Sequence, residues 1–357
     1  MFKERFAKTI AEYERFWERT NTDRPILNGT YRLPDVEPFR APTSPYERWM
    51  DLDYKHAEFR HRFLKELGYV AEGVPMCFTN YGPGCFAACI GGEYELRPDT
   101  IWFDKKQLIE DFENPPEIRF DPESEIWQSV VAEQARYAAD PDLHFSITDI
   151  GGVIDIIASL RGTENLLYDL YDYPDEFKEM ILRVRTEWKK AFDQQLETVR
   201  RAGQPFNHWM NVPSAKPWYP IQCDFSYMIS PKQFEEFVLP DVIDLAQYMD
   251  RSIYHLDGPG EIPHLDMLLD IPELTGIQWV AGDGNAPLTD ECWFDLYRRI
   301  QDKNKNIILI GGIGEHDMAG AERLIKSIDP KGVYISFDAS SREKAEEMVE
   351  AVTEWSR

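Results

Sequence analysis

The chain has 357 residues, of which 43% are hydrophobic and 13% aromatic, enough for one large domain or two smaller ones. Its formal net charge of −25 argues against binding to nucleic acid or to an anionic membrane surface. No apolar run approaches ~20 residues, and the amino-terminal segment lacks the pattern of a secretory signal, so we expect a cytoplasmic protein without a membrane-spanning helix.

The first 70 residues differ in pattern from the rest of the chain. They contain two helical stretches, near Glu4–Glu18 and Pro45–Leu67, joined by a proline-rich segment. We therefore expect an N-terminal helical extension, residues 1–70, packed on a barrel formed by residues 71–357.

From residue 75 onward, short apolar segments alternate with longer helical stretches. Several of these segments are rich in β-branched and aromatic residues, which is typical of parallel strands buried on both faces. The stretch Pro174–Arg201 shows the helical pattern clearly, with apolar residues three or four apart. The predicted strands are Pro75–Asn80, His144–Asp149, Phe206–Asn211, Ile221–Ser226, Ser252–Asp257, Gly276–Asp283, Asn306–Gly311 and Gly332–Asp338.

Eight strands alternating with helices predict a (β/α)8 barrel, or TIM barrel, rather than an open doubly wound sheet. The chain has no Gly-x-Gly-x-x-Gly turn and no P-loop, so a nucleotide-binding open sheet has no support. The active site of a (β/α)8 barrel lies at the carboxyl ends of its strands. The residues at those ends are therefore the candidates for function.

His255 and Asp257 end the fifth predicted strand, just before the loop Gly258-Pro259-Gly260. Residues two apart on a strand share a face, so these two side chains point the same way. An imidazole beside a carboxylate suits a metal site or a proton-transfer pair. The alternative is a His–Asp hydrogen bond that only holds the loop.

Further carboxylates follow other predicted strands, and with Asp257 they are expected to converge on one mouth. Like charges this close need a cation, shared protons or hydrogen-bond donors. A divalent metal is one solution, and carboxylates that cap neighbouring loops are another. These residues are Asp149, Asp224, Asp283 and Asp338.

Aromatic and polar side chains near the same mouth are candidates for the walls of a substrate pocket. For each aromatic residue the alternative is packing inside the barrel. The substrate-binding candidates are Asn80, Tyr81, His208, Trp209, Trp218, Gln222, Trp279 and Asp283.

Several segments resemble the uroporphyrinogen decarboxylase superfamily, which also holds the cobalamin-dependent methyltransferases. The resemblance extends over roughly residues 45–357 and implies a (β/α)8 barrel, often dimeric, so a homodimer is possible here. The segments that carry it are Asn80–Gly84, Asp149–Leu166, Asp224–Pro240, Tyr254–Gly258 and Gly276–Val280.

The methyltransferase branch implies a zinc site made by a His-x-Cys pair after the fifth strand and a later Cys near the eighth. His255 matches the histidine, Asp257 stands at the position of the cysteine, and the later cysteine falls at or near Asp338. Carboxylates are harder ligands than thiolates. The departure is compatible with a site that activates an oxygen or an ether, with another divalent metal, or with no metal.

The decarboxylase branch implies a cofactor-free enzyme that binds a carboxylate-rich macrocycle through an arginine-rich N-terminal segment. This chain lacks that segment, and Arg32 is at best a remnant of it. With its strongly negative charge, the chain does not fit porphyrinogen decarboxylation.

The leading hypothesis from the resemblance is a corrinoid-dependent methyltransferase that acts on a small methoxy or methylamine compound. His255 and Asp257 would be metal ligands or acid–base groups, and Asp338 a third ligand. Trp209, Trp218 and Trp279 would wall the substrate. The corrinoid would be carried by a partner protein, because the chain has no Asp-x-His-x-x-Gly cobalamin signature.

Two alternatives stay open. The first is a metal-independent decarboxylase or lyase for a small carboxylate, with Asp149 or Asp224 as the proton donor and Arg161 holding the carboxylate. The second is a non-catalytic module that docks a corrinoid protein. The chemistry-bearing residues at the mouth argue against the second alternative.

Overall fold

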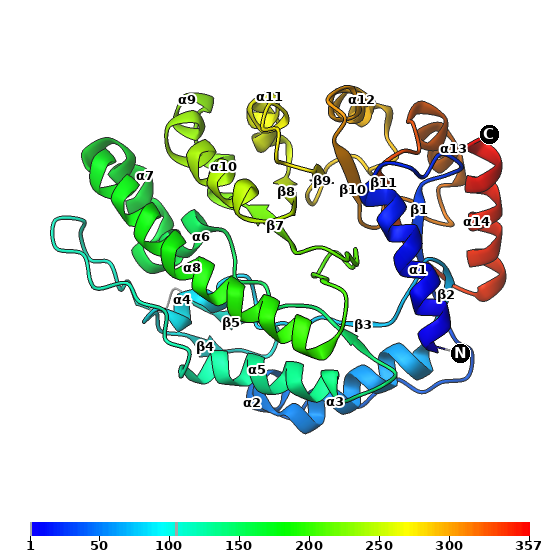
Figure 1. Ribbon diagram of the computed structural model, residues 1–357, viewed down its shortest axis with the longest axis horizontal. Coiled ribbons are helices and arrows are strands. Elements are labelled where there is room, and N and C mark those ends of the chain that lie inside the picture. The colour runs from blue at the N-terminus through cyan, green and yellow to red at the C-terminus, as the bar shows by residue number, and fades with distance from the viewer. Residues whose placement is uncertain (1, 104–105) are drawn as a thin grey trace.

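The computed structural model describes residues 2–103 and 106–357, and it shows an α/β fold in which helices surround a mainly parallel sheet (Figure 1). Within these residues the main sheet has seven strands, in the order β2-β1-β11-β10-β9-β8-β7. All neighbouring pairs run parallel except β1 and β2. The strands are β1 Ile26–Arg32, β2 Leu67–Ala71, β7 Trp218–Gln222, β8 Arg251–Asp257, β9 Gly276–Val280, β10 Asn306–Leu309 and β11 Val333–Ala339.

Two short strand pairs lie outside the main sheet. β3 (Met76–Cys77) runs parallel to β6 (His144–Phe145), and β4 (Glu95–Leu96) forms a hairpin with β5 (Ile101–Trp102). The Ile147 N–H, just after β6, donates a hydrogen bond of 3.1 Å to the carbonyl of Asn207, in the segment before β7.

Helices connect the parallel strands, as crossover connections require. In Figure 1 the helices α10 to α14 form an arc outside the sheet, and α5 and α8 lie on the opposite side. The helices are α1 Phe2–Trp17, α2 Pro45–Met50, α3 Leu52–His61, α4 Cys85–Cys89, α5 Glu125–Ala138, α6 Val153–Arg161, α7 Thr163–Asp172, α8 Pro174–Ala202, α9 Pro231–Gln233, α10 Leu239–Tyr248, α11 Leu265–Leu269, α12 Phe294–Asp302, α13 Met318–Ser327 and α14 Arg342–Trp355. No helix in the described ranges has the length and apolar character needed to cross a bilayer.

The mixed α/β fold with a parallel sheet is confirmed, whereas closure of the strands into a barrel stays a prediction. Seven of the eight predicted strands overlap a strand of the structure, and Phe206–Asn211 was wrong. Phe206 makes only an isolated bridge to Ser214. The segment then turns, because the Asn211 N–H bonds to the His208 carbonyl at 2.8 Å and Asn211 has a φ of 53°.

The prediction that residues 1–70 are a helical extension missed two strands of the main sheet. β1 pairs with β11 in parallel register, and β2 flanks β1. The division into residues 1–70 and 71–357 remains a prediction, but the first part contributes to the sheet itself.

Helix α1 lies across the amino-terminal ends of the strands, in front of the sheet in Figure 1. Trp17 packs on Trp218, the first residue of β7, with ring centroids 5.1 Å apart. The Glu14 carboxylate binds the guanidinium of Arg251, the first residue of β8, through two bonds of 2.8 Å. This packing leaves the carboxyl ends of the strands for a functional site.

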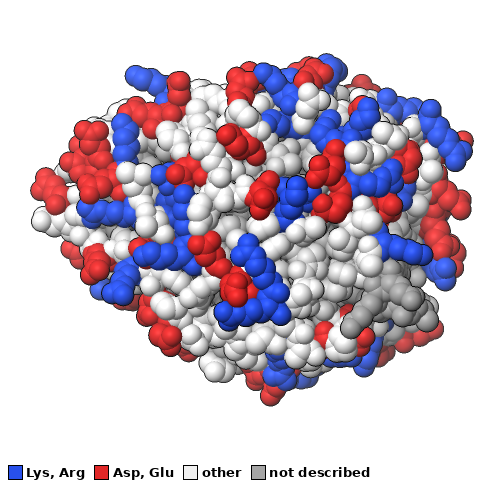
Figure 2. Space-filling view, in the orientation of Figure 1, with Lys and Arg blue, Asp and Glu red and all other residues white. Residues whose placement is uncertain are grey.

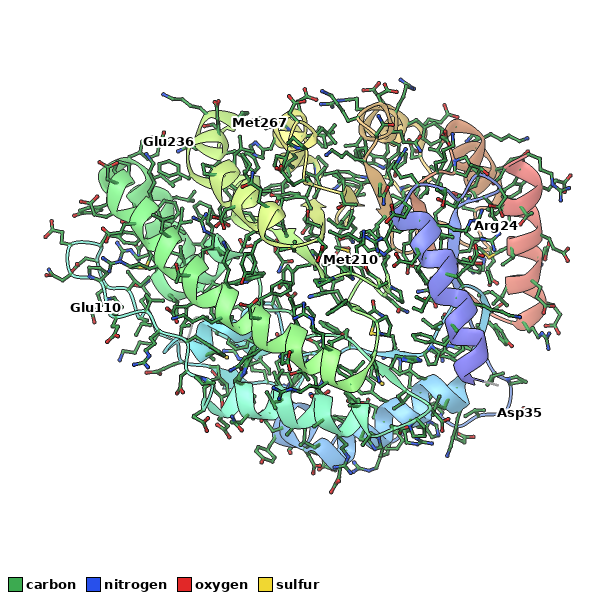
Figure 3. All side chains as sticks on the ribbon, viewed as in Figure 1. Arg24, Asp35, Glu110, Met210, Glu236 and Met267 are labelled. Carbon is green, nitrogen blue, oxygen red and sulfur yellow. The ribbon has the colours of Figure 1, made fainter. Side chains whose placement is uncertain are left out.

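The interior between the sheet and the helices is filled by side chains. Figure 3 shows this packing, with Met210 labelled near the middle of the view. Met210 is 1% exposed, and its carbonyl accepts a hydrogen bond from the Tyr334 hydroxyl at 3.2 Å. On the face that carries α1, acidic and basic side chains are interspersed, as expected for a solvated surface (Figure 2).

Candidate metal centre

Three polar side chains stand level with one another on adjacent parallel strands. The register pairs Gln222 of β7 with His255 of β8, and His255 with Gln278 of β9. His255 Nδ1 lies 2.6 Å from Gln278 Oε1. With this oxygen as the acceptor, Nδ1 carries the proton and Nε2 keeps a free lone pair.

Asp224, His255 and Asp257 each offer a ligand atom within 4.8 Å of the other two. Asp257 is the last residue of β8, and Asp224 follows β7 at the start of a 3-10 turn, Asp224–Met228. In the part of the chain that the structure describes, neither carboxylate forms an ion pair with a basic side chain. Trp209 packs edge-on against His255, with ring centroids 5.3 Å apart. The group can hold a divalent cation.

Two further carboxyl groups hold the backbone of the cluster. The Asp155 carboxylate accepts the N–H of Asp224 at 3.1 Å and that of Phe225 at 2.9 Å. Glu261, which is fully buried, accepts the N–H of Asp257 at 3.1 Å. Hydrogen bonds of this kind orient residues that bind a metal or substrate.

Sequence reasoning missed Asp155, Glu261 and Gln278. Asp155 lies in the first turn of α6, whose start approaches the end of β7 closely. A Cβ on Gly152 would stand 2.1 Å from the Gln222 carbonyl oxygen, so this approach requires glycine. The sequence signal that could have identified Asp155 is a carboxylate one helical turn after the Gly151-Gly152 pair.

The carboxyl groups at this mouth oppose one another's ionisation. Burial raises the pKa of Asp155 to about 8, and the charge of Asp224 adds to the effect. Burial raises the pKa of Glu261 to about 9, while the Asp257 N–H acts in the opposite direction. Asp224 is partly open to solvent, yet desolvation raises its pKa. His255 lowers the pKa of Asp224, and the charge of Asp257 raises it further. A bound cation would relieve this repulsion.

Asp149 lies near the cluster, because it shares a hydrogen bond with Gln222, the residue level with His255. Its Oδ1 accepts bonds from the Tyr219 hydroxyl at 2.8 Å and from Gln222 Nε2 at 3.2 Å. Burial raises the pKa of Asp149, although these bonds and that from the Gly151 N–H oppose the rise. His208 packs on the Tyr219 ring at 4.5 Å, and burial lowers its pKa, so its imidazole is uncharged.

Three aromatic residues expected around the substrate lie elsewhere. Trp218 is at the amino-terminal end of β7 against α1. Trp279 follows Gln278 on β9 and so points to the opposite face, where it packs on Trp293 at 5.0 Å. Tyr81 is fully buried, with the Lys55 ammonium 3.9 Å from its ring centroid.

Three polar candidates also lie apart from the cluster. Asn80 Oδ1 accepts the Gly82 N–H at 2.8 Å and so holds a turn. Asp283 is exposed in the loop after β9. Asp338, expected as a third metal ligand, accepts a bond from the Thr30 hydroxyl and lines a different cavity. Asp224, rather than Asp338, lies with His255 and Asp257.

Arg161, expected to hold a substrate carboxylate, is engaged within the protein. Its guanidinium makes bonds of 2.7 and 3.0 Å to the Asp169 carboxylate, and it also reaches the carbonyls of Ile109 and Glu110. The residue therefore anchors α6 to α7 and the preceding loop.

A cavity of about 410 Å³ opens beside Asp224 and is large enough for a small ligand. Gln222, Asp155 and Asp224 line one side of it, and the hairpin end Trp102-Phe103 lines another. Of the three residues of the cluster, Asp224 is therefore the one that lines this cavity.

Comparison with known proteins supports the fold. No protein-family model and no curated protein matches the chain. Among solved structures, a methyltransferase from Methanosarcina mazei is similar, with a TM-score of 0.60 and 11% sequence identity. The similarity covers 98% of this chain and 99% of that chain. At this identity the likeness shows that the two chains share a fold over their whole length.

Proposed function

We propose that this protein is a metal-dependent methyltransferase with a closed (β/α)8 barrel of the uroporphyrinogen decarboxylase type. It moves a methyl group between a small methoxy or methylamine compound and a corrinoid that a partner protein carries. The observation behind this proposal is the convergence of Asp224, His255 and Asp257 at the carboxyl ends of β7 and β8. The shared fold with a methyltransferase adds support.

The donor set fits a divalent ion such as zinc. His255 presents Nε2 because Gln278 engages Nδ1, and this arrangement is typical of histidines that bind metals. The carboxylates of Asp224 and Asp257 bring two negative charges, which match those of the ion. Oxygen ligands make the site harder than one built from thiolates, so it favours activation of an oxygen or nitrogen over a thiol.

A divalent ion held there would act as a Lewis acid on the oxygen or nitrogen that gives up its methyl group. The protein's own residues supply the positioning. Asp155 and Glu261 fix the backbone at Asp224 and Asp257, and Trp209 restricts the His255 ring. The cavity beside Asp224 would bring the substrate to the cluster.

Methylation of free cob(I)alamin tests this function directly. Zinc-loaded protein would be mixed with a methoxybenzene carrying a labelled methyl group, and conversion to methylcobalamin followed by absorbance and label. We expect label in methylcobalamin with the wild type and none with Asp224→Ala. Release of carbon dioxide from a small carboxylate without metal would instead support the decarboxylase alternative.

Gln278→Leu should weaken metal binding by roughly 10- to 100-fold, because an outer partner that orients a histidine has effects of this size. Leucine leaves the Nδ1–H of His255 without its acceptor. Gln278→Glu keeps an acceptor and is the matched control. Competition with a chromophoric chelator gives both affinities, and equal affinity for Gln278→Leu and wild type would contradict the role.

Metal affinity should rise with pH, and the rise should continue above the usual titration range of an aspartate. The pKa of Asp224 is raised, chiefly by desolvation, so a proton competes with the ion at low pH and leaves as the ion binds. Calorimetry in two buffers with different ionisation enthalpies would count the released protons. Asp224→Asn should release fewer, and affinity that does not change with pH would contradict this prediction.

A further inference from the structure

The cavity beside Asp224 has walls that are apolar and a floor that is acidic. The hairpin of β4 and β5, the start of α6 and the turn after β7 all contribute to the walls. A Cβ on Gly84 would stand 2.6 Å from the Phe103 ring, so the hairpin packs tightly over the loop after Tyr81. The apolar side chains of the described lining include Ile101, Phe103, Ile156, Phe225 and Met228.

The charged residues in the described lining are Asp155 and Asp224, and no lysine, arginine or histidine belongs to it. An ion bound by Asp224, His255 and Asp257 would not make the cavity positive, because two carboxylates already balance its charge. Asp155 would still contribute negative charge whenever it is ionised.

The ammonium of Lys106, three residues after Phe103, lies 3.8 Å from a carboxylate oxygen of Glu93. Two further basic side chains near the described lining in sequence are also engaged outside the cavity. Arg161, at the end of α6, is held by the carboxylate of Asp169. Arg97, in the β4–β5 hairpin, lies 5.0 Å from the Trp102 ring centroid and bonds to Glu95 at 3.4 Å. Neither side chain can balance an anion in the cavity without leaving its present partner.

We infer that the substrate cavity selects by charge, accepting uncharged or cationic methyl donors and rejecting donors that carry a carboxylate, sulfonate or phosphate. This inference rests on the proposed function. An anion entering the cavity would lose hydration near Asp155 and Asp224 and find no basic partner in the lining that the structure describes. A cation would meet no such repulsion and would gain any carboxylate of the lining that is ionised. An uncharged methoxybenzene would gain the apolar walls alone.

Three ligands of matched shape test this charge selection. Para-methoxybenzyl alcohol is uncharged, para-methoxybenzylamine is a cation and para-methoxybenzoate is an anion at neutral pH. Binding to the full chain would be measured by calorimetry and ligand-observed NMR, with and without zinc. We expect the alcohol and the amine to bind and the benzoate to bind on the order of 30-fold more weakly. Benzoate binding as tight as alcohol binding would overturn the inference, as would no binding of any of the three.

A charge placed in the cavity wall provides the matched variants. Met228 lines the cavity and is 47% exposed, so Met228→Lys adds a cation at little structural cost. This variant should tighten benzoate binding by about tenfold and weaken amine binding. Leu182→Lys, on the exposed face of α8, should leave all three affinities unchanged. Alcohol binding that persists in Met228→Lys, without any shift for benzoate or amine, would overturn the inference.

The two proposals fail in different ways. Charge-selective binding without methylation of cob(I)alamin would contradict the methyltransferase function and leave the selectivity standing. Methylation with the anionic donor as efficient as with the alcohol would contradict the selectivity and leave the function standing.

Discussion

Replacing His255 by alanine is expected to abolish methyl transfer and to weaken metal binding by on the order of 1000-fold, or roughly 4 kcal/mol. His255 offers the cluster its nitrogen atom and lies in hydrogen-bond contact with Gln278 on β9, so in the proposed site it would be the nitrogen ligand. Without the imidazole, the ion would be left with the two carboxylates of Asp224 and Asp257 and would lose its nitrogen ligand. The dissociation constant for cobalt, followed by visible absorption, and the rate of cob(I)alamin methylation give the two readouts.

His316→Ala is the control for this variant. The His316 side chain is 94% exposed and lies 3.5 Å from Glu315, away from the cluster. Its removal should change neither readout. Full activity and unchanged cobalt affinity in His255→Ala would rule out His255 as a ligand.

Arg251→Ala is expected to lower the free energy of unfolding by about 2 kcal/mol, because the buried guanidinium loses its hydrogen bonds to the partly exposed carboxylates of Glu14 and Glu18. Arg251 is 4% exposed and binds Glu14, Glu18 and the Ser214 hydroxyl. Its guanidinium also lies 5.1 Å from the Trp17 ring centroid. The substitution therefore loosens α1 from the amino-terminal ends of the strands. Urea unfolding with an unchanged m-value would measure the loss.

Arg201→Ala is the matched control, because Arg201 is paired with Glu197 on an exposed turn of α8. Its effect should stay within about 0.5 kcal/mol. A double-mutant cycle with Glu14→Ala would isolate the coupling between Arg251 and Glu14. A loss below about 1 kcal/mol for Arg251→Ala would contradict the role given to this ion pair.

The sequence predicts the alternation of strands and helices because its apolar segments are short, buried on both faces and bounded by turns. β8 and β9 follow this pattern closely. The strand β1 escaped prediction because Ile26–Arg32 contains Asn28 and Gly29 and gains its place by pairing with β11. The residues of Phe206–Asn211 have the pattern of a strand, yet the segment forms a turn, closed by the hydrogen bond from the Asn211 N–H to the His208 carbonyl.

The candidate site was predictable to the extent that it depends on strand ends and alternation. These place His255 and Asp257 on one face and mark Asp224 as a carboxylate after a strand. Asp224 lies in the cluster and Asp338 does not because of which strand ends are adjacent in the sheet. The local pattern of apolar and polar residues along the sequence does not contain this information. The contact between Gln278 and His255 could be predicted only with the register between β8 and β9. Trp279 is the next residue along β9, so its side chain points to the other face, against Trp293.

Metal content is the most direct test of the central claim. Elemental analysis would compare wild-type protein, purified without an affinity tag and reconstituted with zinc, with Asp257→Asn treated in the same way. We expect about one equivalent of divalent ion per chain in the wild type and a large loss in the variant. Wild-type protein that binds no divalent ion would contradict the metal centre at Asp224, His255 and Asp257.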